Sequence, residues 1–398
     1  MTPSPGTSVP NDIGHRTSDI GHRTVLATAH RFTTRSSLWL TLAFFAVAVP
    51  IAYAFGWTDI TTVNQFGRYL SLALVALGLD LIWGYAGILS LCQMIFFTLG
   101  GYCIGMHLAM KGPLLGDGIP QSLFIVSSQV SGMKLPWFWQ PFDSAALSLI
   151  AVVVIPGIIA FMYGWLAFRS RVKGVYFSII TQATTLAASQ VIRQNDLQLC
   201  GTNGLTPLGT LFGFSLNDAN TKFALYLMTV LLVAVAFLLC RMLVASRAGR
   251  VLVAIRDNES RLRFAGYQPI AYKTFAFVVA AVLAAVGGML YTPQNGIITP
   301  SKMEPIESIY IVAMVALGGR GTLTGAILGS LLFSFSFSYL STTFADMWLI
   351  ILGSLFIFVI LAMPDGLVGA WRRLGLWLSE RAPSSAVAVQ KAGKKATP

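Results

Sequence analysis

The sequence predicts an all-α polytopic integral membrane protein with about ten transmembrane helices, and two observations support this. Apolar segments, each close to the length of a bilayer crossing, follow one another from residue 39 to residue 363. The composition is 55% hydrophobic and 11% charged, which leaves too little polar surface for a chain folded in water. A hydrocarbon core of about 30 Å needs roughly 20 apolar residues per helix, and a helix satisfies its backbone groups within one segment.

Hydropathy places ten candidate spans between two polar tails. They cover residues 37–56, 69–83, 90–110, 145–168, 174–192, 223–245, 274–292, 307–317, 323–342 and 347–363. We assign residues 1–36 to a polar, disordered cytoplasmic N-terminal tail. Residues 37–365 form the transmembrane domain, and residues 366–398 form a basic cytoplasmic C-terminal tail.

The formal charge of +12 is better explained by membrane topology than by a nucleic-acid partner. Lys and Arg are retained in cytoplasmic loops, and here they concentrate in residues 169–173, in residues 246–273 and after the last span. The loops at residues 110–145 and 192–222 hold few positive charges. This asymmetry predicts that both termini face the cytoplasm, which requires an even number of spans and fits ten.

Glycines interrupt the apolar pattern at two places, so discontinuous helices are expected there. The pattern G-x-x-G-x-L-[ST] occurs at Gly84 and Gly87 and again at Gly318 and Gly321. Glycine-broken segments in corresponding halves are typical of transporters built from internal repeats. A chance match in a chain with 37 glycines explains the pattern equally well. Asp80, the one carboxylate inside an apolar span, is expected to brace the first break rather than to carry an ion.

The most specific functional signal is the cytoplasmic segment 246–273. Apolar residues at helical spacing, with arginines on the other faces, predict two short amphipathic helices. Asp257 and Asn258 can cap the second helix, and Gly266 can end it. We interpret the segment as a surface that docks a partner protein at the membrane. The alternative is a basic loop that holds the topology and lies on anionic lipid.

The same segment resembles the coupling segment of branched-chain amino acid ABC importer permeases, in their LivM-like branch. The residues that carry the resemblance, and that it assigns to ATPase coupling, are Gly249, Arg250, Ala254, Ile255, Arg256, Asp257, Asn258, Glu259 and Gly266. Further matches, in the family's order, lie at residues 84–91, 176–181, 201–206 and 317–323, so that the resemblance covers roughly residues 65–370.

One branch is more similar, the permease subunit of urea ABC importers. The blocks at residues 135–139 and 79–85 resemble that branch. The chain departs from the general amino-acid pattern at Cys92 and Gln93, where those permeases tend to carry Gly-His. This departure weakens the amino-acid interpretation.

The resemblance implies a multi-pass permease of the bacterial inner membrane that translocates urea by alternating access. Two ABC ATPase subunits would dock beneath residues 249–273, a second homologous permease would complete the pore, and a periplasmic binding protein would deliver the solute. ATP and Mg would bind the partner subunits, since the chain has no G-x-x-x-x-G-K-[ST] phosphate loop. We expect no enzymatic site, no metal site, no cofactor bound by this chain and no nucleic acid, and we expect contact with membrane lipid.

A small neutral solute needs hydrogen-bonding side chains along its path and no buried fixed charge. The candidates are Gln93, Thr181, Gln182, Thr184, Thr185, Thr202 and Asn203. Packing between helices explains such residues about as well as a pore lining does. Three alternatives stay open: a branched-chain amino acid permease, a passive urea channel and a secondary carrier. A channel has no need of the capped basic segment, and a carrier usually has more carboxylates within the membrane.

Overall fold

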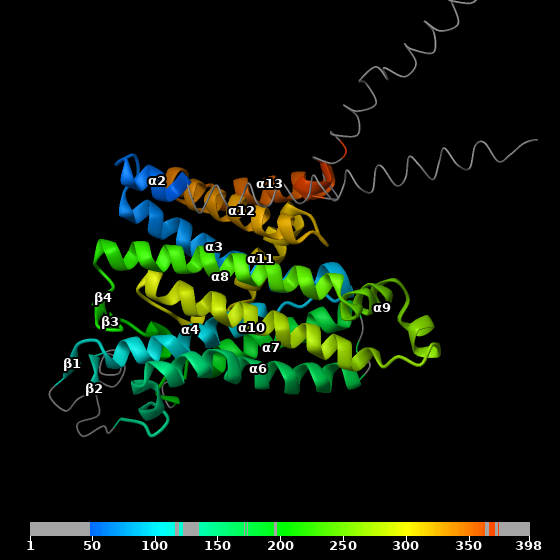
Figure 1. Ribbon diagram of the computed structural model, residues 1–398, viewed down its shortest axis with the longest axis horizontal. Helices are drawn as coiled ribbons and strands as arrows, with labels where there is room; N and C mark the ends of the chain where they lie inside the picture. The colour runs from blue at the N-terminus through cyan, green and yellow to red at the C-terminus, as the bar shows by residue number, and fades with distance from the viewer. Residues whose placement is uncertain are drawn as a thin grey trace, which may run out of the picture.

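The computed structural model describes residues 48–115, 119–121, 135–170, 172, 174–194, 197–362, 366–370 and 373. The N-terminal tail, most of the first candidate span and most of the C-terminal tail lie outside the described residues, and the predictions about them stay predictions. The described part is an elongated bundle of nearly parallel and antiparallel helices (Figure 1).

In this described part, seven helical segments are long and apolar enough to cross a bilayer. They are α3 (Ile60–Asp80) with its π-helical continuation η2 (Leu81–Tyr85), α4 (Gln93–Met110), α6 (Ala145–Arg169), α7 (Val175–Ile192), α8 (Ala219–Ala245), α10 (Pro269–Asn295) and α12 (Leu323–Thr343). Shorter helices are α2 (Val49–Ala54), α11 (Pro305–Gly318) and α13 (Trp348–Ala362).

The nine candidate spans from 69–83 onward each coincide with one of these helices. The largest difference is at α3, which begins at Ile60 because its polar first turns are anchored to α10. The Asn64 side-chain amide donates to the carbonyl of Gln294 at 2.7 Å, and Arg68 Nη1 donates to Asn295 Oδ1 at 3.0 Å. Hydropathy does not detect a helix that is polar where it leaves the apolar core.

The two ends of the bundle differ. Helix α9 (Arg247–Phe264) projects beyond the ends of α8 and α10 at one end (Figure 1). Two small antiparallel hairpins lie at the opposite end: β1 (Leu114–Leu115) with β2 (Ile119–Pro120), and β3 (Thr210–Leu211) with β4 (Phe214–Ser215). The 3-10 turns are η3 (Gln140–Asp143), η5 (Gly201–Asn203) and η6 (Pro300–Met303).

Helix α10 is the centre of the bundle and packs against α3, α4 and α6. Its small residues allow this close approach: Ala281, Ala284 and Ala285 are fully buried. A Cβ on Gly287 would lie 2.7 Å from the backbone oxygen of Ser71 on α3. Without a hydrophobic driving force inside lipid, such close contact between small residues is what holds membrane helices together.

Candidate functional site

Helix α9 consists of two helical segments, as the sequence predicts. Ser246 Oγ accepts a hydrogen bond from the N–H of Gly249 at 3.4 Å and caps the first segment. Asn258 is extended, with φ −160° and ψ 92°, and its Oδ1 accepts from the N–H of Arg261 at 3.0 Å. Asn258 therefore ends one segment and caps the next. Gly266, with φ +85°, follows the end of the second segment.

The two faces of α9 have different surroundings. Leu252 and Ile255 are buried in a small apolar cluster with Ala86 and Ala276, so this face is fixed to the bundle. Arg250 and Asp257 are exposed. Of the expected coupling residues, Arg256, Asn258 and Gly266 are exposed as well, so a partner protein could reach all five.

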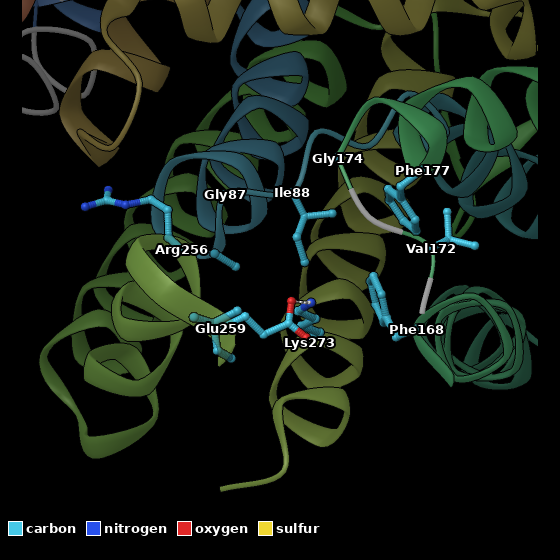
Figure 2. Close-up of a pocket in the computed structure, with 11 residues that line it drawn as sticks. Gly87, Ile88, Phe168, Val172, Gly174, Phe177, Arg256, Glu259 and Lys273 are labelled. Atoms are coloured by element: carbon cyan, nitrogen blue, oxygen red, sulfur yellow. Dashed lines mark hydrogen bonds and ion pairs between the residues drawn. The ribbon is translucent and has the colours of Figure 1, made fainter. Parts of the chain in front are cut away.

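Glu259, in contrast, faces the protein. Its carboxylate accepts from Lys273 Nζ at 2.8 Å and from Arg263 Nη2 at 2.6 Å, and its side chain is 13% exposed. Lys273 lies in the first turns of α10, and its Nζ is 5.9 Å from the centre of the Phe168 ring. Figure 2 shows Glu259 and Lys273 meeting near Gly87. Glu259 thus anchors α9 to α10.

Arg256 connects α9 to the first helix break. Its Nη1 donates to the carbonyl oxygen of Gly84 at 2.8 Å. The chain after η2 passes close to the arginine stem: a Cβ on Gly87 would lie 2.7 Å from Arg256 Cγ. Gly87 also has φ +73°, a conformation that favours glycine. The break is therefore shaped around this side chain.

The two glycine breaks meet each other inside the bundle. Asp80 Oδ1 accepts a hydrogen bond from the N–H of Gly321 at 2.6 Å, and a Cβ on Gly84 would lie 2.6 Å from the Gly321 nitrogen. Gly318 ends α11, and the guanidinium of Arg320 lies 5.5 Å from the Trp83 ring centre. The bracing role expected of Asp80 is confirmed, and the group that it holds is the other break.

Hydroxyl groups of α7 satisfy the backbone between η2 and α4. Thr181 Oγ1 accepts from the N–H of Leu91 at 3.0 Å, and Thr185 Oγ1 donates to the carbonyl of Leu91 at 2.8 Å. Ser178 Oγ donates to the carbonyl of Leu89 at 2.9 Å. Irregular backbone at membrane depth needs such partners. Thr181 and Thr185 therefore bind the irregular backbone that follows the first break.

The other pathway candidates are dispersed. Gln93 is 1% exposed, and neither atom of its amide has a hydrogen-bond partner among the described residues. Gln182 Oε1 is also without one there. Thr184 bonds to the carbonyl of Ile180 and lies 3.2 Å from Tyr163 Oη. Thr202 and Asn203 are exposed in η5, which contacts η6.

A cavity of about 110 Å³ lies between α9, α10 and the first break (Figure 2). The Glu259–Lys273 ion pair, the backbone near Gly87 and the rings of Phe168 and Phe177 line it. The cavity marks the place where α9, the first break and the start of α7 converge.

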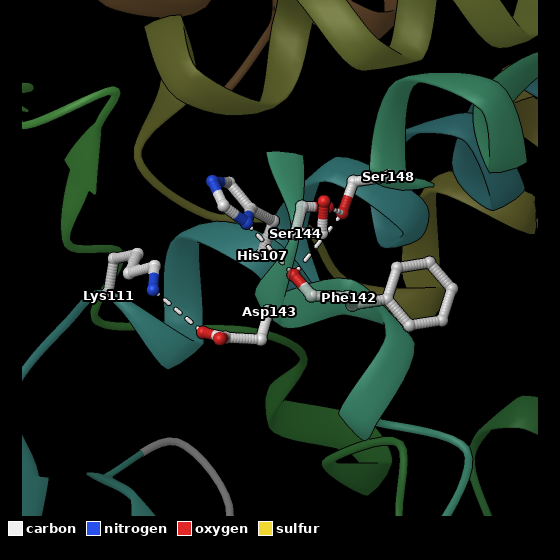
Figure 3. Close-up of polar contacts among 6 residues, drawn as sticks. All are labelled: His107, Lys111, Phe142, Asp143, Ser144 and Ser148. Atoms are coloured by element: carbon white, nitrogen blue, oxygen red, sulfur yellow. Dashed lines mark hydrogen bonds and ion pairs between the residues drawn. The ribbon is translucent and has the colours of Figure 1, made fainter. Parts of the chain in front are cut away.

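At the opposite end, α4 holds the turn that precedes α6 (Figure 3). The ring Nδ1 of His107 is 2.9 Å from the carbonyl oxygen of Phe142, and Lys111 pairs with Asp143 at 2.7 Å. The hydrogen bond from Lys111 lowers the pKa of Asp143 below its usual value. The nearby Trp139 is fully buried and donates its Nε1–H to the carbonyl of Gln198 at 3.2 Å.

The sequence analysis misses two residues that hold the first break and α9 in place, Ser178 and Lys273. Ser178 has a signal, because it precedes Thr181 by three residues and Thr185 by seven, the spacing of one helical face. Lys273 also has one: it is the sole charged residue between Arg263 and Lys302, at the start of an apolar span. Its partner Glu259 cannot be identified from sequence spacing.

Comparison with known proteins gives a family match over most of the chain. The family model described as "Branched-chain amino acid transport system / permease component" matches residues 61–360. The chain is 26% identical to the high-affinity branched-chain amino acid transport system permease protein LivM of Escherichia coli (strain K12), over 87% of this chain and 78% of the relative. It is 23% identical to the probable branched-chain amino acid transport permease protein LivM of Methanocaldococcus jannaschii, over 83% and 91%.

The chain is also similar to permease proteins named LivH. The permease protein LivH of Salmonella typhimurium is 25% identical over 75% of this chain and 91% of the relative. No solved structure matches the chain.

Proposed function

Because the chain belongs to the permease components of branched-chain amino acid transport systems, we propose that it forms half of the membrane channel of an ATP-driven importer. It is a multi-pass inner-membrane permease subunit of the ABC type and not an enzyme. Two ABC ATPases dock on α9, and ATP and Mg bind to them. A periplasmic binding protein delivers solute at the opposite end, where the hairpins lie.

The observation that carries this proposal is the construction of α9. One face is fixed to the bundle by Leu252, Ile255 and the Glu259–Lys273 pair, while Arg250 and Asp257 are exposed beyond the bundle. A basic loop that merely holds the topology needs no cap at Asn258 and no anchor. A second, homologous permease completes the pore, in line with the similarity of this chain to both LivM and LivH.

We propose urea as the solute, on the chemistry of one side chain. The buried Gln93 amide has a free donor and a free acceptor among the described residues, which complements a small neutral diamide. The two described buried charges near the coupling helix and the first break each have a partner, Asp80 in the N–H of Gly321 and Lys273 in Glu259, which suits a neutral solute better than a zwitterion.

Branched-chain amino acids are the second candidate, and the names of the relatives favour them over urea. Uptake by cells that lack this gene separates the two. Loss of labelled urea uptake at low external concentration, with leucine uptake intact, is the expected result. Loss of leucine uptake with urea unaffected assigns the chain to amino acids instead.

Gln93→Leu extends the test to the side chain. It keeps the volume of the glutamine and removes both polar groups, so solute uptake should fall while the amount of inserted protein is unchanged. Gln140→Leu, the same substitution at an exposed position that is not a pathway candidate, is the matched control. Equal uptake by both variants removes Gln93 from the pathway.

A further inference from the structure

The geometry points to Arg256 as the residue that transmits movement of the docked ATPases to the meeting point of the two helix breaks. This inference rests on the proposed function of α9 and names the route by which that function acts. We call residues 80–87 and 318–321 together the break junction.

Arg256 is placed between the partner side and the membrane side. Its side chain is 39% exposed, and its Nε lies 3.2 Å from the exposed carboxylate of Asp257. The other end of the same guanidinium donates from Nη1 to the Gly84 carbonyl at 2.8 Å. One rigid, planar group therefore contacts both the exposed turn and the break.

The break junction passes the displacement from one half of the chain to the other. The carbonyl that Arg256 binds belongs to Gly84, whose backbone lies directly against Gly321. Asp80, one helical turn earlier, binds the N–H of Gly321 at 2.6 Å. A shift of Gly84 therefore moves the chain at Gly321 with it, because the two backbones are in close contact and the Asp80 carboxylate also holds the Gly321 N–H.

The second connection from α9 has a different character. Glu259 and Lys273 bind each other where both are shielded from water, and Lys273 belongs to α10, the tightly packed centre of the bundle. This contact suits a fixed pivot. Arg256 contacts a π-helical turn followed by irregular backbone, which can move without breaking a regular helix. The two contacts make α9 a lever with a pivot at Glu259 and an output at Arg256.

The test uses the full complex with its ATPases in proteoliposomes, with labelled urea and labelled leucine as probes. The variants are Arg256→Gln and Arg256→Lys, and Arg241→Gln is the matched control, because Arg241 is exposed near the end of α8 and lies outside α9. Arg256→Gln should keep the ATPases bound and hydrolysing ATP. Solute moved per ATP should fall about tenfold, the effect of one hydrogen bond from a charged donor. Arg256→Lys keeps one donor and should recover part of the loss.

A double-mutant cycle with Asp80→Ala checks the route. If both residues act through the break junction, their effects on solute moved per ATP are not additive. Additive effects, or unchanged coupling in Arg256→Gln, overturn the inference. Loss of the ATPases from Arg256→Gln also overturns it, because Arg256 would then be a docking residue. Failure of the wild-type complex to couple ATP to uptake of either probe instead refutes the proposed function.

Discussion

Asp80 shows how a buried charge can serve structure in this chain. A carboxylate within an apolar span is a candidate for ion or solute contact by default. Here it is fully buried and bound to the Gly321 backbone. The contact satisfies an N–H that α11 and α12 leave without a helical partner, because the chain between them is not helical.

Removing that acceptor should destabilise the protein. Asp80→Ala leaves the Gly321 N–H unsatisfied and is expected to cost about 1–3 kcal/mol, measured as thermal unfolding of the purified protein in detergent. Asp80→Asn retains an oxygen that can accept and should lose much less. Equal stability of the alanine variant and the wild type would show that the contact does not stabilise the protein.

Gly84 makes a second residue-scale prediction. Gly84→Ala places a Cβ 2.6 Å from the Gly321 nitrogen, so the two breaks must separate, at an expected cost of about 1–3 kcal/mol. Gly157→Ala is the control, because its Cβ would meet Val282 at an ordinary 3.7 Å. Unfolding temperatures of the two variants are compared in the same detergent. A Gly84→Ala variant as stable as Gly157→Ala contradicts the close approach.

Sequence patterns predict the glycine breaks, but they do not predict that the breaks touch. The local signal is a change in hydropathy and glycine content within each motif. The contact between Gly84 and Gly321 depends on how α3, α11 and α12 pack, and no periodicity records it. For the same reason Asp80 can be predicted as a brace while its partner cannot.

At the scale of elements, the helices are the most predictable part. The positions of the spans follow from hydropathy, apart from the polar start of α3, and the two segments of α9 follow from capping residues. The role of α7 could not be predicted in the same way. Thr181, Thr185 and Ser178 form a polar stripe, and a stripe does not say whether it faces solute or backbone. In the structure this polar stripe binds the irregular backbone that precedes α4.

Helix α9 provides an element-scale prediction that separates docking from anchoring. Asp257 is exposed, so Asp257→Arg should leave the protein inserted and folded while ATPase co-purification falls. Glu259→Gln weakens the contacts to Lys273 and Arg263, so it should lower the unfolding temperature. If Asp257→Arg retains the ATPases and full uptake, this turn does not dock them.

At the scale of the whole molecule, the two ends of the bundle are expected to face opposite sides of the membrane. The four native cysteines are buried, so they give little background to thiol labelling. In intact cells a membrane-impermeant thiol reagent should label Trp137→Cys and miss Arg261→Cys, and opening the cells should expose the second. Labelling of Arg261→Cys in intact cells would reverse the topology.

Under the proposed function, the α9 end docks the ATPases, the break junction transmits their movement and the hairpin end receives the solute. The arrangement of α9 against the first break is what sets this chain apart from a passive channel, in which no group on the cytoplasmic surface needs to contact the pore helices.

The most direct test of the central claim is solute uptake into proteoliposomes that hold this chain, its partner permease and the ATPases, with the binding protein outside. The account predicts accumulation of labelled solute against its gradient that requires ATP inside the vesicles and stops when ATP is replaced by a non-hydrolysable analogue. Equilibration without ATP would indicate a channel. Accumulation driven by an imposed ion gradient alone would indicate a carrier, and either result would contradict the account.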